Sequence, residues 1–420
     1  MNSSIKFKLS FMMFLEFFIW GAWFVTLGTY LIQNLQAEPF QISNVFSTQS
    51  LGAIIAPFII GMIADRYFNA ERILGILHLL GAALMFQMYN APDIGTFYPY
   101  VLAYMILYMP TLALVNSVSF RQMINPEKQF SAIRIWGTIG WIVAGLSISY
   151  LFKWDSPEGA AQGMLRNTFL MTSVASLVLG LFSFVLPKTP PVKANTEDKP
   201  SFASIVGLDA VKLLKDRNFF IFFVSSILIC IPLAFYYQNA NPFLAEIGLS
   251  NATGKMTIGQ MSEVFFLLLL PVFFTRFGFK KTILVGMLAW GVRYLLFAYG
   301  DSGDLAFMLI LGIALHGICY DFFFVSGQIY TDSKAGVKYK SAAQGLITLA
   351  TYGVGQLIGF WVAGFVGDKY QELRTTDLAA FWQQTWIVPA VIAFVVMFIF
   401  MIFFKDEKVV KVGSETEGNS

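Results

Sequence analysis

Ionisable side chains inside long apolar stretches are the residues of this chain that are best placed to do chemistry. Burying a charge in hydrocarbon is costly, so such residues are rare and usually serve a function. They are Glu16, His78, Arg134, Glu263, Arg293, His316 and Asp321. Groups of this kind can bind a polar solute. A buried carboxylate can also carry a proton, because a medium of low dielectric favours its uncharged form.

Two polar groups have the spacing of one helix face. Gln260 and Glu263 are three residues apart, so a helix offers their amide and carboxylate to one cavity. Arg134, Thr138 and Trp141 follow the spacing i, i+4, i+7, which places a charge, a hydroxyl and a flat ring in one stripe. We predict that both groups contribute to a polar binding site.

Two further clusters contain a carboxylate. His316 and Tyr320 share a helix face, and Asp321 lies about 100° round the helix from Tyr320. Glu16 is followed four residues later by Trp20, which gives a similar stripe near the N-terminus. The candidates for coupling a proton to binding are therefore Glu263, Asp321 and Glu16.

A structural ion pair is the alternative for each carboxylate, for example Glu263 with Arg293 or Asp321 with Arg134. His78 and Arg293 are interpreted as packing groups, because their stretches are the third and ninth of the chain and such helices are usually peripheral in two-bundle transporters. A lone histidine in an apolar helix is more often a satisfied hydrogen-bonding group than a proton relay, so the role of His316 stays open.

The elements that must position these residues are membrane spans. The chain is 57% hydrophobic and 13% charged, which does not suit a water-soluble shell around a core. Crossing a bilayer takes about 20 apolar residues. The expected spans are 9–33, 42–65, 71–90, 96–119, 131–152, 166–187, 218–245, 257–275, 281–300, 304–330, 341–367 and 380–404. These spans are long, and their apolar residues do not alternate with polar ones as in the strands of a membrane barrel. The pattern excludes a barrel and predicts an all-α membrane protein.

Twelve spans use up almost all of the 420 residues, so no soluble catalytic domain is expected. If both termini are cytoplasmic, 21 of the 28 lysines and arginines lie on the cytoplasmic side and five on the other, which supports that orientation. The net charge of +3 is too small and scattered to suggest a nucleic-acid partner. The only large surface partner expected is the lipid bilayer.

A polar segment rich in lysine and proline divides the spans into two halves. We predict an N-terminal six-helix bundle at 1–187, a cytoplasmic linker at 188–216, a C-terminal six-helix bundle at 217–404 and a cytoplasmic tail at 405–420. Paired halves are typical of secondary transporters. A weak internal repeat supports the pairing. Asp65 and Arg66 lie between spans two and three, and Arg276 lies at the equivalent place between spans eight and nine.

Glycines and prolines suggest closely packed or irregular helices. Gly355 and Gly359 form a small-xxx-small contact in span eleven, for which plain helix packing is the simpler interpretation. Pro232 and Pro242 predict irregular backbone in span seven, because proline frees carbonyl groups of the preceding turn. Cys230 and Cys319 lie inside apolar runs and show no metal-ligand or disulfide spacing.

The turn that contains Asp65 and Arg66 resembles the loop motif of the major facilitator superfamily, in which it acts as a gating latch. Two extra residues separate Arg66 from the next basic position. Further stretches resemble the nucleoside:proton symporter family, the bacterial nucleoside permeases, over almost the whole chain. These stretches are Trp20-Gly21-Ala22-Trp23, Tyr108-Met109-Pro110-Thr111-Leu112, Arg134-Ile135-Trp136-Gly137-Thr138-Ile139-Gly140, Gly207-Leu208-Asp209-Ala210, Gln260-Met261-Ser262-Glu263, Tyr320-Asp321-Phe322-Phe323 and Ala342-Ala343-Gln344-Gly345.

This resemblance implies the major facilitator fold, with a nucleoside held between two six-helix bundles. The contacts that it implies are Arg134, Thr138, Trp141, Gln260, Glu263, Tyr320 and Asp321. The chain departs from the family pattern at two places. The seventh-helix amide positions become Ala234 and Tyr237, with Gln238 and Asn239 beside them, and a first-helix glutamine becomes Glu16.

The sequence therefore predicts a proton-coupled nucleoside symporter of a bacterial inner membrane, a multi-pass monomer that works by alternating access. Its partners are a nucleoside and protons, with no cofactor and no metal. A transporter of a sugar or a modified nucleoside is the nearest alternative. An intramembrane enzyme or a receptor is disfavoured, because no nucleophile with a nearby base and no metal-ligand cluster is present in the sequence.

Overall fold

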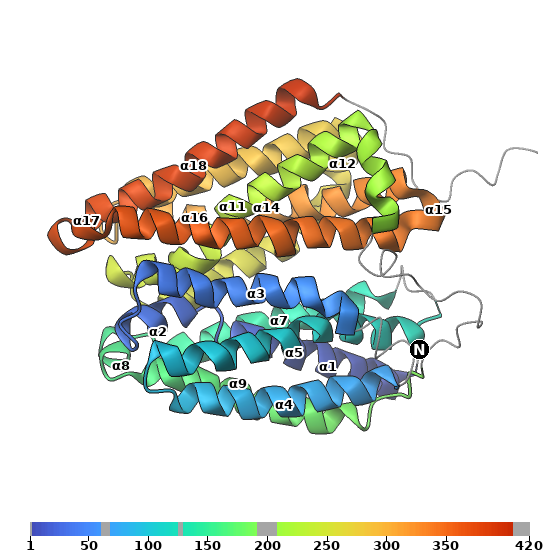
Figure 1. The fold of residues 1–420 in the computed structure, drawn as a ribbon, viewed down its shortest axis with the longest axis horizontal. Helices are drawn as coiled ribbons and strands as arrows, with labels where there is room; N and C mark the ends of the chain where they lie inside the picture. The colour runs from blue at the N-terminus through green and yellow to red at the C-terminus, as the bar shows by residue number, and fades with distance from the viewer. Residues whose placement is uncertain (1, 60–67, 125–128, 191–207, 406–420) are drawn as a thin grey trace, which may run out of the picture. The chain divides into compact units, whose positions relative to one another are not determined.

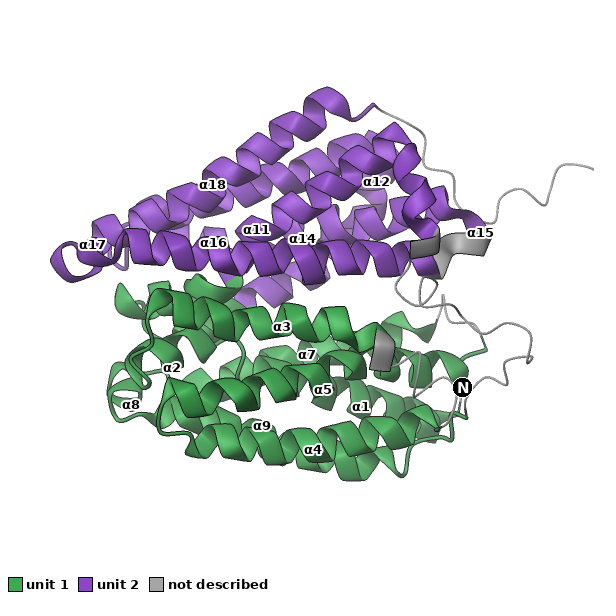
Figure 2. Cartoon of the chain, in the orientation of Figure 1, with its two compact units in different colours: residues 1–199, 237–257 green, residues 200–236, 258–420 purple. Residues whose placement is uncertain are grey.

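The computed structural model describes residues 2–59, 68–124, 129–190 and 208–405, and the regular elements in these ranges are all helices (Figure 1). By contacts between residues the chain forms two compact units (Figure 2). Unit 1 comprises Met1–Lys199 and Tyr237–Thr257, and unit 2 comprises Pro200–Tyr236 and Ile258–Ser420. The segment Tyr237–Thr257 thus packs with the first half of the sequence. The predicted bundle and linker boundaries remain a prediction.

The first half of the chain contains the helices of the first six predicted spans. They are α1 (Ser3–Gly21), α2 (Leu27–Gln33), α3 (Pro39–Ile59), α4 (Ala70–Asn90), α5 (Ile94–Arg121), α7 (Ser131–Leu146), η2 (Ser147–Leu151), α8 (Pro157–Ala161), η3 (Met164–Arg166) and α9 (Asn167–Ser183). The first span is interrupted after Gly21, and α2 continues it from Leu27.

The second half contains the helices of the remaining spans. They are η4 (Leu208–Lys215), α11 (Arg217–Glu246), α12 (Ala252–Tyr299), α13 (Ala306–Ala314), α14 (His316–Tyr320), η5 (Asp321–Val325), α15 (Ser326–Thr348), η6 (Leu349–Gly355), α16 (Gln356–Lys369), α17 (Gln371–Thr376) and α18 (Leu378–Phe403). The described end of the predicted linker is therefore a short 3-10 helix, η4, and not extended chain.

Nine helical stretches of the described residues are long and apolar enough to cross a membrane. One of them, α12, holds two predicted spans, which meet at Gly278 with a φ of 76°. A left-handed φ of this size favours glycine, so Gly278 permits the sharp turn between the two spans. Together with α1 and α2 as one span and α3 as another, these stretches account for the twelve predicted spans.

Helices of unit 1 pack in pairs, with α1 along α7, α4 along α9 and α3 along α5. The closest approach is at Gly140, where an added Cβ would lie 2.2 Å from the carbonyl oxygen of Phe14. Small residues at such crossings let backbones touch, which is how helices associate where lipid supplies no hydrophobic driving force. Gly140 therefore sets the distance between α1 and α7, the two helices that carry Glu16 and Arg134.

Side-chain hydrogen bonds join the end of α11 to the other helices of unit 1. Thr29 Oγ1 donates to Asn241 Oδ1 at 2.6 Å, and Ser43 Oγ donates to Gln238 Oε1 at 3.1 Å. The backbone N–H of Thr253, at the start of α12, donates to Asp155 Oδ2 at 3.0 Å. Buried polar groups of this kind are satisfied by partners from distant parts of the sequence, which places the segment Tyr237–Thr257 in unit 1.

The irregular backbone predicted in the seventh span is wrong, because α11 runs without a break past Pro232 and Pro242. A neighbouring side chain satisfies one of the polar groups there: Tyr294 OH donates to the carbonyl oxygen of Pro232 at 2.5 Å. Gly355 and Gly359 both lie against α11, next to Cys230 and Ala234 respectively. Their role in the described structure is thus helix packing.

Three π-helical segments interrupt the spans: η2, η5 and η6. A π-turn widens the helix and leaves it less regularly bonded, and such turns are frequent at functional sites. One of the three, η5, begins at Asp321, and η6 contains Tyr352. The sequence pattern gave no sign of these segments.

Candidate functional site

The stripe predicted on the fifth span lies in α7 of unit 1, where Arg134, Thr138 and Trp141 are all half-buried. The guanidinium of Arg134 stands 4.1 Å from the centroid of the Phe17 ring. Within the described part of unit 1 no carboxylate forms an ion pair with Arg134. Among the described residues of this unit, its guanidinium lies over an aromatic ring and beside no carboxylate, so Arg134 keeps donors to offer to a ligand.

Aromatic rings from α1 and α5 lie around Trp141. The Trp20 ring meets Trp141 edge to face with centroids 5.6 Å apart, and Trp20 meets Tyr108 in the same manner at 5.8 Å. Such contacts fix the ring planes, which is needed if one of them is to stack on a flat ligand.

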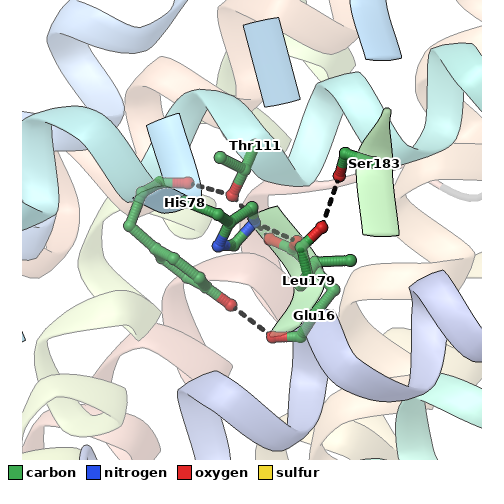
Figure 3. Close-up of polar contacts among 6 residues, drawn as sticks. Glu16, His78, Thr111, Leu179 and Ser183 are labelled. Atoms are coloured by element: carbon green, nitrogen blue, oxygen red, sulfur yellow. Dashed lines mark hydrogen bonds and ion pairs between the residues drawn. The ribbon is translucent and has the colours of Figure 1, made fainter. Parts of the chain in front are cut away.

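Glu16 and His78, from α1 and α4, form a buried pair in unit 1 (Figure 3). Glu16 Oε2 lies 2.9 Å from His78 Nε2, and Glu16 Oε1 lies 2.5 Å from Thr111 Oγ1 of α5. Tyr108 OH donates to the backbone carbonyl oxygen of Glu16 at 2.8 Å. His78 is the partner of a candidate carboxylate 62 residues away in the sequence, and this buried pair is of the kind given above as the structural alternative for Glu16.

In unit 2 one imidazole ring lies between Arg293 and Glu263. His316 Nδ1 is 3.1 Å from Arg293 NH1, and His316 Nε2 is 3.8 Å from Glu263 Oε2. The Arg293 guanidinium also stands 3.6 Å from the centroid of the Tyr236 ring, and the Tyr236 and His316 rings are stacked with centroids 5.5 Å apart. Glu263 and Arg293 were the alternative ion pair. In the structure the His316 ring lies between them, so their contact is indirect.

This arrangement fixes the tautomer of His316. A guanidinium has only donors, so Nδ1 must accept from Arg293, and the ring hydrogen sits on Nε2. That hydrogen points toward the Glu263 carboxylate. At 3.8 Å this is an electrostatic contact and not a hydrogen bond, and with the Arg293 charge on the far side of the ring it suits an ionised carboxylate.

Asp321 has a different environment in the same unit. It is 1% exposed, against 24% for Glu263, and its Oδ2 is buried without a hydrogen-bond partner among the described residues. Within the described part of unit 2 it forms no ion pair. An ionised carboxylate in such surroundings is costly. Asp321 is therefore the better placed of the two to hold a proton.

Tyr320, the residue before Asp321 in the sequence, forms a hydroxyl pair with Tyr352. Their OH groups are 2.7 Å apart, and the Tyr320 ring lies 5.8 Å from the His316 ring between centroids. A small cavity of about 30 Å³ lies against Tyr352, lined also by Ser226, Thr348 and Thr351. This space accommodates one water, and the polar groups around it could bond to that water.

Close packing of α12 on the end of α13 and on α14 positions Glu263. Ser262 Oγ donates to the carbonyl oxygen of Ala314, and a Cβ added at Gly317 would lie 2.5 Å from the backbone of Ser262. Only a glycine fits there. Glu263 follows Ser262 in α12, and His316 precedes Gly317 in α14. The backbone contact between Ser262 and Gly317 therefore brings the Glu263 carboxylate close to the His316 ring.

We expect Gly317→Ala to destabilise the protein by about 1–3 kcal/mol, because the added methyl overpacks a backbone contact that cannot move away. Thermal unfolding of the purified protein in detergent measures this. Gly345→Ala is the matched control, because nothing lies within 4 Å of a Cβ there. If the Gly317→Ala and Gly345→Ala variants have the same melting temperature, α12 and α14 are not held together at this contact.

The remaining predicted residues are placed as follows. Gln260 is half-buried in α12, less than one turn before Glu263. Asp65 and Arg66 lie outside the described residues. Unit 1 also has a cavity of about 450 Å³, lined by Thr29, Asp155, Asn241 and their neighbours. None of the predicted contact residues lines this cavity. Sequence reasoning missed Thr111 and Tyr352, for which a hydroxyl in an apolar span was the only signal.

The chain matches a known protein family over nearly its whole length. The family model described as "Nucleoside H+ symporter" matches residues 3–409. The putative nucleoside transporter YegT of Escherichia coli is 43% identical over 95% of this chain and 93% of its own length. The xanthosine permease of the same organism is 33% identical over 96% of each chain.

A solved structure also matches the fold. The nucleoside permease NupG of Escherichia coli is 30% identical over 98% of this chain and 99% of its own length. Two crystal structures of the nucleoside transporter NupG, one of them of a mutant, superpose with TM-scores of 0.86 and 0.83 at 30% identity. They cover 96% and 97% of this chain, and all of the NupG chain in each case.

Proposed function

This chain belongs to the nucleoside H+ symporter family of membrane transporters, and from that premise we propose that it takes nucleosides into the cell together with protons. Relatives named as nucleoside transporters match 95% and 98% of the chain, and the fold is that of NupG. Uptake proceeds by alternating access in a bacterial inner membrane, with both termini cytoplasmic and with Asp65 and Arg66 in a gating loop.

The observation that carries the proton coupling is the contrast between the two carboxylates of unit 2. Asp321 is buried, and one of its oxygens has no hydrogen-bond partner among the described residues, while Glu263 faces the Nε2–H of His316. Two carboxylates in environments of opposite character divide the work between them. Asp321 binds and releases the proton, and Glu263 stays ionised and accepts hydrogen bonds from the substrate.

Recognition of a nucleoside requires a surface for the flat base and acceptors for the ribose hydroxyls. Trp141 supplies the ring, held edge-on by Trp20, and Arg134 supplies donors that no carboxylate in the described part of its unit occupies. Gln260 and Glu263 supply an amide and a carboxylate from one helix face, with Thr138 and Tyr320 adding hydroxyls. A site of this kind rejects ligands that leave its polar groups unpaired.

Uptake by purified protein in proteoliposomes tests this proposal. We expect radiolabelled uridine to accumulate about tenfold inside for each proton carried when an inward proton gradient of about tenfold is imposed. Without the gradient we expect only equilibration. Empty liposomes treated in the same way are the control.

Competition by a panel of nucleosides, free bases and sugars then defines the substrate class. Nucleosides should displace labelled uridine, and free bases and sugars should not, because each lacks half of the recognised groups. Displacement by sugars alone would replace the proposal with the sugar-transporter alternative.

A further inference from the structure

The Glu16 cluster of unit 1 contains a hydroxyl that lies between two acceptor oxygens. Thr111 Oγ1 lies 2.5 Å from two oxygens, Glu16 Oε1 and the carbonyl oxygen of Tyr108 (Figure 3). A hydroxyl has a single hydrogen, so it donates to one of these oxygens at a time. The two possible orientations correspond to two protonation states of Glu16.

In the first orientation Thr111 donates to Glu16 Oε1. This suits an ionised Glu16, which can only accept hydrogen bonds. His78 Nε2–H donates to the other oxygen, Oε2, at 2.9 Å. Both oxygens of the buried carboxylate are then bonded, as burial of a charge requires.

In the second orientation Thr111 donates to the carbonyl oxygen of Tyr108. A carbonyl only accepts, so the remaining short contact between Thr111 Oγ1 and Glu16 Oε1 needs a hydrogen on Glu16. A protonated Glu16 supplies it. Oε2 is then a carbonyl-like acceptor that still receives the hydrogen of His78 Nε2. The change costs no movement of a helix, because only the Thr111 hydroxyl turns.

We propose that Glu16 is a second proton-binding site of this transporter, that Thr111 is the rotor which satisfies it in both states, and that its proton is carried in the same cycle as that of Asp321. The last part of this statement rests on the proposed function. In the step, a proton from water adds to Oε1 of Glu16, and the Thr111 O–H turns from Glu16 to Tyr108. The reverse step returns the proton to water.

The charged and titratable groups around Glu16 allow this. Helix α4 contributes His78, helix α5 contributes Tyr104 and Tyr108, and helix α7 contributes Arg134. Helix α9, the remaining helix packed on α1, has no titratable residue between Asn167 and Ser183. Among the described residues, α5, α7 and α9 carry no carboxylate, and α1 carries none besides Glu16. Helix α4 also carries Glu71, two turns before His78, and its two oxygens accept from Asn69 Nδ2 and from the backbone N–H of Thr189.

Infrared difference spectroscopy of the protein in lipid, between alkaline and acidic buffer, tests the site without any nucleoside. We expect a protonated carboxylic acid band that Glu16→Gln removes and that remains in Asp321→Asn. Thr111→Val should move this band to higher frequency, because the acid has lost its hydrogen-bond partner. Thr111→Ser, which keeps the hydroxyl, should leave the band in place. A Glu16→Gln spectrum identical to that of the wild type would overturn the proposal.

Transport provides the second test. With an inward proton gradient of about tenfold, two carried protons sustain about hundredfold accumulation of uridine and one proton about tenfold. We expect the higher value for the wild type, the lower value for Glu16→Gln and no accumulation for Glu16→Gln with Asp321→Asn. Equal accumulation by Glu16→Gln and wild type would contradict the shared cycle. Failure of the wild type to move uridine at all would instead defeat the proposed function, and the infrared result would stand.

Discussion

Asp321→Asn is expected to lose about tenfold in uridine accumulation at an inward proton gradient of about tenfold, because one carried proton is lost. Asparagine has the shape of the protonated aspartic acid but never releases a proton. The Oδ2 of Asp321, which has no hydrogen-bond partner in the described residues, becomes an amide or carbonyl group without a charge to bury. We therefore expect the variant to fold and to bind uridine.

Counterflow separates this loss of coupling from a loss of transport. In counterflow, labelled uridine exchanges with unlabelled uridine, and the empty carrier need not return. We expect Asp321→Asn to retain exchange close to the wild-type rate while accumulation falls. Asp304→Asn, an exposed aspartate in a loop of unit 2, is the matched control and should change neither. Loss of exchange and accumulation together in Asp321→Asn would favour a structural role and would remove the residue from the coupling scheme.

Glu263→Gln is expected to weaken uridine binding by about 10-fold to 100-fold, the value of one hydrogen bond to a charged group. The change replaces one acceptor oxygen by an NH2 group, which leaves a ribose hydroxyl facing a donor. It also removes the negative charge that faces the Nε2–H of His316. Binding measured by isothermal calorimetry, or by displacement of labelled uridine, gives the size of the loss.

The ligand can be changed in a matched way to locate this contact. If Glu263 accepts from the ribose hydroxyls, 2′-deoxyuridine binds the wild type less tightly than uridine does, and Glu263→Gln narrows the difference. The effects of the two changes are then non-additive, as expected for groups in contact. Glu372→Gln, an exposed glutamate of α17, should alter neither affinity. Equal losses for uridine and 2′-deoxyuridine would place the contact of Glu263 elsewhere on the substrate.

The two predictions assign proton binding to Asp321 and substrate binding to Glu263, two roles that the sequence did not divide between these residues. Sequence reasoning offered Glu263, Asp321 and Glu16 as proton carriers without choosing among them, because burial and neighbours decide the matter and neither is visible in a linear chain. The structure distinguishes them by environment. Glu263 faces His316, and Asp321 has an oxygen that finds no partner in the part of the chain that the structure describes. Glu16 has a hydroxyl neighbour, Thr111, that can switch from donor to acceptor.

Residues interpreted from the sequence as packing groups have polar partners that the sequence did not show. His78 is the partner of Glu16, and Arg293 fixes the tautomer of His316. The contact that joins Tyr320 to Tyr352 spans 32 positions of the sequence. Spacing along one helix shows which side chains share a face. It does not show which face of a neighbouring helix meets them.

The sequence by itself determined the class of protein, the number and course of the spans, and the positions of polar groups within them. These are local properties, because a bilayer requires each span to be apolar and to satisfy its own backbone. The tertiary structure alone decided which polar groups are partners, where the π-helical segments lie, and that Tyr237–Thr257 packs with unit 1. These depend on how each helix is rotated against its neighbours, and close contacts such as Gly140 on Phe14 and Gly317 on Ser262 set that rotation.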